Sequence, residues 1–282
     1  MAIAIAYLFY FIAASASPLQ RRWLATREDR IHDGQIHFAS RVALIIAVLG
    51  LLLPFFSPFY LAGSTWYLIV LALICGTAGA TYFISMYSSQ RHVEAGVTTL
   101  VNNIYTPVTI ILATLFLSER LDPIQIAGTA LLLTGLVIVS KKHKVGKIKY
   151  DKYFMMMLLS GVALGVLLTA ERALQKATGF TAGTLFSWWS QFIFLAIIVF
   201  ITKSKSKYSK KDISITGGLR FLQALSWVVL IFVVGNLSLV SAVTTFKVVI
   251  IFIAAAIFLN EREDLPRKIV GSLVALAGLL LM

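Results

Sequence analysis

Two isolated basic side chains, Lys247 and Arg220, interrupt otherwise apolar stretches of this sequence. A lone cation with no nucleophile beside it is best suited to pairing with the carboxylate or phosphate of a small molecule. Thr244 lies three residues before Lys247, while Gln223 and Trp227 follow Arg220 at i+3 and i+7. On a helix these spacings keep the side chains on one face. We therefore predict two polar faces that contribute to one binding site.

A third polar stripe at helical spacing lies nearer the N-terminus. Its middle members, Thr98, Asn102 and Tyr105, are predicted to line a cavity, and hydrogen bonding between helices is the alternative. Pro107 should bend this helix, because proline cannot donate a backbone hydrogen bond. Tyr10, in the first apolar segment, is a further candidate to stack on a substrate, with packing as its alternative. The whole stripe is Glu94, Thr98, Asn102, Tyr105 and Thr109.

No arrangement typical of an enzyme is visible in the sequence. The four histidines are scattered along the chain, and Cys75 is the single cysteine. There is no metal-ligand spacing, no glycine-rich phosphate loop and no activated serine or cysteine. We expect neither catalytic residues nor a metal ion nor a cofactor, and we expect that the protein is not an enzyme.

The elements that must position these residues are membrane-spanning helices. Hydrophobic residues make up 59% of the 282-residue chain, charged residues only 13%, and the mean hydropathy is +0.88. A soluble domain carries about a quarter charged residues, whereas a bilayer-spanning helix needs roughly 20 apolar ones. An all-α integral membrane protein with ten transmembrane helices is predicted. The segments are approximately 2–19, 35–56, 66–88, 94–117, 122–140, 153–173, 178–201, 214–235, 237–259 and 264–282.

Depth in these segments predicts the sign of the substrate. Lys247 is about 15 Å inside its segment at about 1.5 Å per residue, close to the bilayer midplane, and Arg220 is about 10 Å inside. No acid is expected at this depth, because Glu94 and Glu171 lie near segment ends. A cavity of this kind favours an anion or a zwitterion over a cation. Without a deep carboxylate as proton carrier, facilitated diffusion, exchange and proton coupling through an uncharged Lys247 all stay open.

The net charge of +13 is explained by loops rather than by a nucleic-acid partner. Most of the 25 Lys and Arg residues lie in loops on one side, including linker 141–152 and the run 203–211. Positive loops face the cytoplasm, so both termini are predicted outside a cell membrane. Anionic lipid headgroups are the expected contact of these loops. Nucleic acid is not expected as a partner. The protein is expected to be a monomer.

Two stretches of the chain resemble each other. Residues 117–139 read LSERLDPIQIAGTALLLTGLVIV, and residues 259–281 read LNEREDLPRKIVGSLVALAGLLL. This similarity predicts a five-helix unit used twice, as residues 1–140 and 153–282. Because five spans reverse the direction of entry, the second unit is inverted, and alternating access is the functional expectation. The matches are Glu119-Arg120 with Glu261-Arg262, Gly128 with Gly271, Gly135 with Gly278 and, less firmly, Val97-Thr98-Thr99 with Val243-Thr244-Thr245.

These features resemble the EamA type of the drug/metabolite transporter superfamily. The resemblance covers nearly the whole chain and is sharpest at 97–139 and 243–281. The sequence departs from the family pattern at Ser118 and Asn260, where glycine commonly precedes Glu-Arg, and it has no counterpart of Pro107 in the ninth helix. The resemblance implies a central cavity between the halves, small-molecule transport and cytoplasmic termini. For the termini we keep the location that the loop charges predict, outside the cell membrane.

The leading hypothesis is a secondary transporter of small organic anions or zwitterions such as amino acids. The alternative is an exporter of neutral or cationic hydrophobic compounds, with Lys247 merely hydrogen-bonded within the protein. A membrane scaffold without transport is a third interpretation. In the leading hypothesis the partners are a small-molecule substrate and membrane lipids.

Overall fold

A computed structural model describes residues 2–25, 34–61, 63–90, 92–93, 95–140, 152–258 and 265–281. The described chain is helical, with one short 3₁₀ turn at Leu53–Phe55 and no strand. The α-helices are α1 (Ala2–Ala25), α2 (Gln35–Gly50), α3 (Thr65–Ser89), α4 (Ala95–Asn102), α5 (Tyr105–Phe116), α6 (Pro123–Ser140), α7 (Lys152–Thr178), α8 (Phe180–Thr202), α9 (Lys210–Val234), α10 (Leu237–Thr244), α11 (Lys247–Phe258) and α12 (Leu265–Leu280).

Each predicted segment coincides with one helix or with a broken pair of helices. The fourth segment is divided into α4 and α5, and the ninth into α10 and α11. In the described residues, α1, α2, α3, α7, α8 and α9 belong to stretches long and apolar enough to cross a membrane. The remaining apolar helical stretches are shorter, at 10–17 residues. The prediction of an all-helical membrane protein is confirmed, and the number of ten spans stays a prediction.

The surface and the interior reverse the pattern of a soluble protein. Large apolar side chains such as Phe56 and Phe200 are 85% and 84% exposed. Several serine and threonine side chains in the helices are instead fully buried, among them Ser160, Thr184 and Thr216. Lipid can solvate the apolar exterior, and interior hydroxyls then find partners on helical backbones and neighbouring helices.

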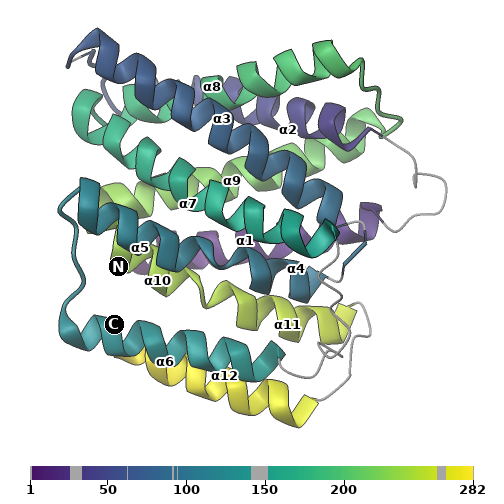
Figure 1. Ribbon diagram of the computed structural model, residues 1–282, viewed down its shortest axis with the longest axis vertical. Helices are drawn as coiled ribbons and strands as arrows, with labels where there is room; N and C mark the ends of the chain where they lie inside the picture. The colour runs from purple at the N-terminus through teal and green to yellow at the C-terminus, as the bar shows by residue number, and fades with distance from the viewer. Residues whose placement is uncertain are drawn as a thin grey trace.

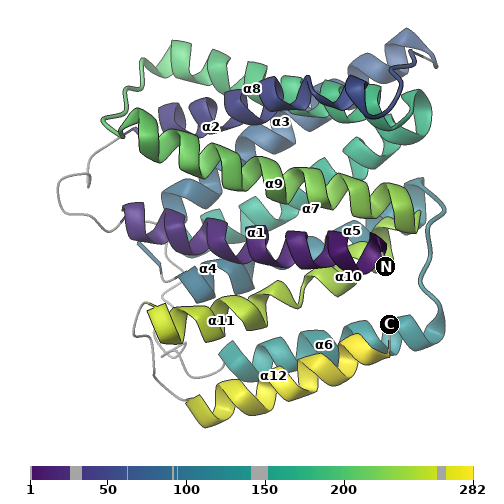
Figure 2. The same ribbon diagram turned by 180° about the vertical axis from the view of Figure 1, so that it is seen from behind.

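The helices are stacked along the long axis of the molecule (Figure 1). Helix α3 lies along α7 at one end, where α8 also packs against both. Helix α1 lies along α9 on the opposite face, as Figure 2 shows. Helices α6 and α12 pair at the other end. Both chain ends lie on the same side of the bundle.

The break between α4 and α5 has the cause that the sequence indicated. Pro107 lies four residues after Asn103 and has no N–H to donate to its carbonyl. That carbonyl accepts from the Thr106 amide at 3.0 Å instead. The helical ladder is therefore interrupted at Asn103 and Ile104, and α5 restarts at Tyr105.

The break between α10 and α11 occurs without proline and was not predicted. The amides of Thr245 and Phe246 each reach back only three residues, to the carbonyls of Ala242 and Val243, both at 3.2 Å. The Thr245 hydroxyl also donates to the Ser241 carbonyl at 3.0 Å. Back-bonding of this kind bends helices, so a run of small hydroxyl residues produces the break that proline produces in α4–α5.

The two broken helices match in length and spacing. Helices α4 and α10 each have 8 residues, and α5 and α11 each have 12. Tyr105 and Lys247, the first residues after the breaks, are 142 positions apart, the same separation that relates Glu119 to Glu261. The match of Thr98 with Thr244 is one turn out of step with the breaks.

Glycines bring α6 and α12 into backbone contact. A Cβ on Gly135 would stand 2.5 Å from the Ala275 nitrogen and 2.6 Å from the Gly271 carbonyl oxygen. A Cβ on Gly278 would meet Leu132 and Gly128 at the same two distances. The contact is reciprocal, and the helices run antiparallel (Figure 1).

We expect that Gly135→Ala destabilises the protein by about 1–3 kcal/mol, because the added methyl group meets rigid backbone. Gly218→Ala is the matched control, since a Cβ there meets nothing within 4 Å. In α9 it should be neutral or stabilising by up to about 1 kcal/mol. Thermal unfolding in detergent measures both variants, and equal melting temperatures would contradict the close contact.

Candidate substrate-binding site

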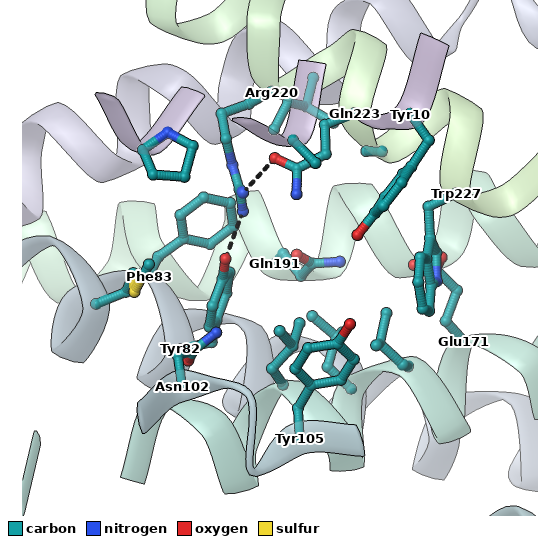
Figure 3. A pocket seen from close by; sticks show the side chains of 18 of the residues that line it. Tyr10, Tyr82, Phe83, Asn102, Tyr105, Glu171, Gln191, Arg220, Gln223 and Trp227 are labelled. Atoms are coloured by element: carbon teal, nitrogen blue, oxygen red, sulfur yellow. Dashed lines mark hydrogen bonds between the residues drawn. The ribbon is translucent and has the colours of Figure 1, made fainter. Parts of the chain in front are cut away.

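A cavity with an empty volume of about 840 Å³ lies among the central helices. That volume includes the space at the open mouth of the cavity. Side chains from α1, α2, α3, α4, α5, α7, α8, α9 and α11 line it, and Figure 3 shows it from close by. The polar lining residues are Tyr10, Tyr82, Thr99, Asn102, Tyr105, Glu171, Gln191, Arg220, Gln223 and Lys247, with Trp188 and Trp227.

Lys247 is the first residue of α11 and is 7% exposed. Its Nζ donates to the hydroxyls of Tyr10 and Tyr105, both at 3.1 Å. The same nitrogen lies 5.7 Å and 4.6 Å from the centroids of those rings. Among the described residues, no acidic side chain lies within 4.0 Å of it. The break in the helix thus exposes the Lys247 ammonium to the cavity, and its partners among the described residues are neutral.

Further donors surround Lys247. The hydroxyls of Tyr10 and Tyr105 point toward each other across the open space in Figure 3. Trp227 packs on both rings, at centroid distances of 5.6 Å and 6.3 Å. Its buried Nε1–H has no hydrogen-bond acceptor in the described part of the chain. Hydroxyls, an indole N–H and an ammonium together form an environment that favours a bound anion.

Arg220 occupies another wall of the cavity. One terminal nitrogen donates to Gln223 Oε1 and the other to the Tyr82 hydroxyl, each at 2.8 Å (Figure 3). The guanidinium also lies 5.4 Å and 5.3 Å from the ring centroids of Tyr82 and Phe83. Its Nε is buried without an acceptor among the described residues. The described partners of this second cation are likewise neutral groups.

The structure brings together most of the residues predicted for the site, but not all. Thr98 is buried and does not line the cavity, because the turn of α4 directs Thr99 there instead. Thr244 also lies outside the lining. Its hydroxyl is 3.5 Å from the hydroxyl of Tyr105, which does line the cavity. Both predictions of direct lining were wrong. The predicted residues that do line it are Lys247, Asn102, Tyr105, Arg220, Gln223, Trp227 and Tyr10.

Asn102 has a fixed position at the end of α4. Its Oδ1 accepts a hydrogen bond from the Ser160 hydroxyl of α7. Gly161 permits this approach, since a Cβ there would stand 2.6 Å from the Asn102 carbonyl oxygen. Asn102 therefore lines the cavity and also joins α4 to α7. At this residue both interpretations of the polar stripe apply, cavity lining and hydrogen bonding between helices. Glu94 lies outside the described residues.

Glu171 corrects the expectation that no carboxylate lies deep. Helix α7 continues to Thr178 rather than ending near 173, so Glu171 is about 10 Å inside its end at about 1.5 Å per residue. The side chain is 4% exposed and lines the cavity. The signal in the sequence was the apolar residues that resume after Glu171, at Ala173 and Leu174.

Arg21 was missed by the sequence reasoning. It follows Pro18, a lining residue, by one turn of α1 and is 1% exposed. Its guanidinium lies 4.3 Å from the Phe38 ring centroid and 4.4 Å from that of Tyr87. It donates to Gln35. The cluster fills the bundle directly beyond the cavity at the end of α1.

The family profile of the "EamA-like transporter family" matches residues 1–141, which is half of the chain. The chain belongs to this family. The EamA-like chain is also 24% identical over 217 residues to a "Probable terminal-alkyne amino-acid exporter" of Streptantibioticus cattleyicolor, covering 74% of this chain and 71% of that protein. A solved crystal structure of a protein matches with a TM-score of 0.69 and 12% identity, over 99% of this chain and 96% of that one.

These similarities bear on different properties of the EamA-like protein. The family match and the apolar helices make it a multi-pass membrane transporter. The solved structure, at 12% identity, supports the fold alone.

Proposed function

We propose that this protein is a secondary transporter that moves a small organic anion or zwitterion, such as an amino acid, by alternating access. Lys247 carries the proposal: it is buried, lines the cavity and has no acidic partner among the described residues. A buried ammonium is unfavourable unless an anion or several dipoles compensate it. A substrate carboxylate would supply that compensation and accept from the tyrosine hydroxyls as well.

The relative from Streptantibioticus cattleyicolor supports this substrate class, because amino acids are named in its description. An amino acid carries the carboxylate that Lys247 requires. The aromatic lining of the cavity also suits an apolar side chain.

The second part of the proposal is that the chain consists of two inverted five-helix units. They comprise residues 1–140 and 153–282, which are joined by 141–152. The matched breaks in α4–α5 and α10–α11 support it, as does the reciprocal antiparallel contact of α6 with α12. A reciprocal contact between equivalent residues is typical of two-fold symmetry. Antiparallel partners require an axis in the membrane plane, which is the geometry of an inverted repeat.

Alternating access is supported by the position of the breaks. Transporters commonly bind substrate where helices are discontinuous near the midplane. Here both breaks adjoin the site, and the hydroxyls of Thr106 and Thr245 join them at 2.6 Å. The Arg21 cluster obstructs one end of the cavity, so release toward that end requires its aromatic rings to separate.

The protein is proposed to work as a monomer in a cell membrane, with both termini outside and its basic loops on anionic lipid. Loop charge supports this orientation, and both ends of the described chain lie on one side (Figure 1). Alkaline phosphatase fused to the C-terminus should be active, and an inactive fusion would reverse the orientation.

Counterflow in proteoliposomes tests the proposed function. Vesicles are loaded with unlabelled L-amino acids, L-propargylglycine among them, and entry of the labelled compound is measured. Parallel assays use 4-pentynoate, but-3-yn-1-amine and tetraphenylphosphonium. We expect counterflow of amino acids and carboxylates and none of the cations. Exchange of cations alone would contradict the proposal.

Export of neutral or cationic hydrophobic compounds is the second candidate function. Glu171 favours it, because a buried carboxylate and the rings of Phe83 and Trp188 line the same cavity. In that function Lys247 is held by the two tyrosines and takes no part in binding. The same set of probes separates the two functions, since only the second predicts exchange of tetraphenylphosphonium.

A further inference from the structure

Glu171 is the one acidic side chain among the described residues that line the cavity. It is 4% exposed and lies on α7, whereas Lys247 is on α11 and Arg220 on α9. Figure 3 shows Glu171 on the side of the cavity where Trp227 lies, away from Arg220. The cavity therefore contains both signs of charge, carried by different helices.

The immediate partners of Glu171 favour its negatively charged form. The Ser187 hydroxyl donates to Oε2 of the carboxylate. Gln191 Nε2 in turn donates to the Ser187 oxygen at 3.0 Å, which directs the serine proton toward Glu171. Gln191 also lines the cavity. Hydrogen bonds that all run toward a carboxylate stabilise its ionised state.

No cation of the described chain compensates this charge. The described ion pairs involve a different acid, Glu119, and Oε1 of Glu171 makes no hydrogen bond to a described residue. The two basic residues of the cavity are directed elsewhere, Lys247 to tyrosines and Arg220 to Tyr82 and Gln223. A buried carboxylate without a cationic partner is unfavourable and tends to take up a proton. A positive charge brought in by a ligand would remove that penalty.

We propose that Glu171 binds the ammonium group of a substrate whose carboxylate is bound at Lys247. This inference rests on the proposed function and narrows it, from anions and zwitterions to zwitterions with a primary amino group. The Ser187 hydroxyl holds the carboxylate in place, and Gln191 offers its amide oxygen to the same ammonium. Trp227 packs on the two tyrosines that accept from Lys247 and lies beside Glu171 in Figure 3, so its ring is available to pack against the carbon that carries both groups.

Three probes that differ only in their charged groups test the assignment. L-propargylglycine has both groups, 4-pentynoate lacks the amine, and but-3-yn-1-amine lacks the carboxylate. Binding is measured by titration calorimetry and by counterflow, with the wild-type protein and with Glu171→Gln. The glutamine keeps the shape of the side chain and an acceptor for Ser187, and thermal unfolding verifies that the variant is folded.

Wild-type protein should bind the amino acid more tightly than either partial probe. In Glu171→Gln, affinity for L-propargylglycine should fall roughly 10- to 100-fold, the range for a lost charged hydrogen bond. Affinity for 4-pentynoate should be equal or higher, because a negative charge has been removed from the cavity. Glu171→Asp should retain part of the preference for the amino acid, which also keeps the test valid if Glu171→Gln fails to fold.

Several outcomes would overturn the assignment. Equal losses for the amino acid and for 4-pentynoate would mean that Glu171 supports the site without contacting the amine. Unchanged binding together with loss of proton-driven accumulation would make Glu171 a proton carrier instead. Failure of the proposed function is recognised separately, because the wild-type protein would then bind neither L-propargylglycine nor 4-pentynoate.

Discussion

Replacing Lys247 with methionine is expected to abolish transport of carboxylate substrates while leaving the protein folded. Methionine fills similar space but removes the ammonium that donates to Tyr10 and Tyr105. Loss of a buried, hydrogen-bonded charge contact to a ligand costs about 2–5 kcal/mol, equivalent to a loss of affinity of roughly 30-fold or more. The change leaves no buried counter-charge uncompensated, because Lys247 has no acidic partner among the described residues.

The control for this variant is Lys207→Met, in the exposed loop between α8 and α9. It removes the same charge outside the cavity and should transport normally. Counterflow of 4-pentynoate and of L-propargylglycine measures both variants, with melting temperatures measured alongside. Normal transport by Lys247→Met would exclude Lys247 from substrate binding and favour export of neutral or cationic compounds.

Much of the site could be predicted because deep polar residues in apolar helices have few uses. Lys247 and Arg220 were identified by charge and depth alone, and the cavity includes both. Asn102 and Tyr105 were identified by helical spacing, at 3.6 residues per turn. The helical spacing of side chains does not continue across a break, however, and such a break separates α4 from α5. Thr98 was assigned to the lining as part of a stripe that included Tyr105 beyond the break, although the residue of α4 that lines the cavity with Asn102 is Thr99.

Other features depend on contacts that no local pattern encodes. The role of Glu171 depends on where α7 ends, and segment ends are the least certain part of a prediction from sequence. The break at Thr245 involves no proline and arises from hydroxyl back-bonds. Arg21 is adjacent to Arg22 in a basic run typical of a loop. Only packing against Phe38 and Tyr87 distinguishes it from its neighbour.

Glu119 joins helices from both proposed units, and its loss should have the largest effect on stability. Its carboxylate accepts from Arg172 Nε at 3.0 Å and from Lys176 Nζ at 2.8 Å. It also accepts from the Leu237 amide, where α10 begins. Glu119 and Arg172 are both buried. These contacts give Glu119 a structural role between helices, and its repeat match, Glu261-Arg262, lies outside the described residues.

We expect that Glu119→Gln lowers stability by about 3–5 kcal/mol, because it leaves the buried Arg172 guanidinium without a counter-charge. The melting temperature in detergent should fall by roughly 10 °C for a chain of this size. Lys176→Met is the matched control: it breaks the same carboxylate's other ion pair, but Lys176 is 40% exposed, so the loss should be below about 1 kcal/mol. The double variant Glu119→Gln/Arg172→Met should be more stable than the sum of the single losses predicts, because no uncompensated charge remains. Equal effects of Glu119→Gln and Lys176→Met would mean that the buried pair does not join the two units.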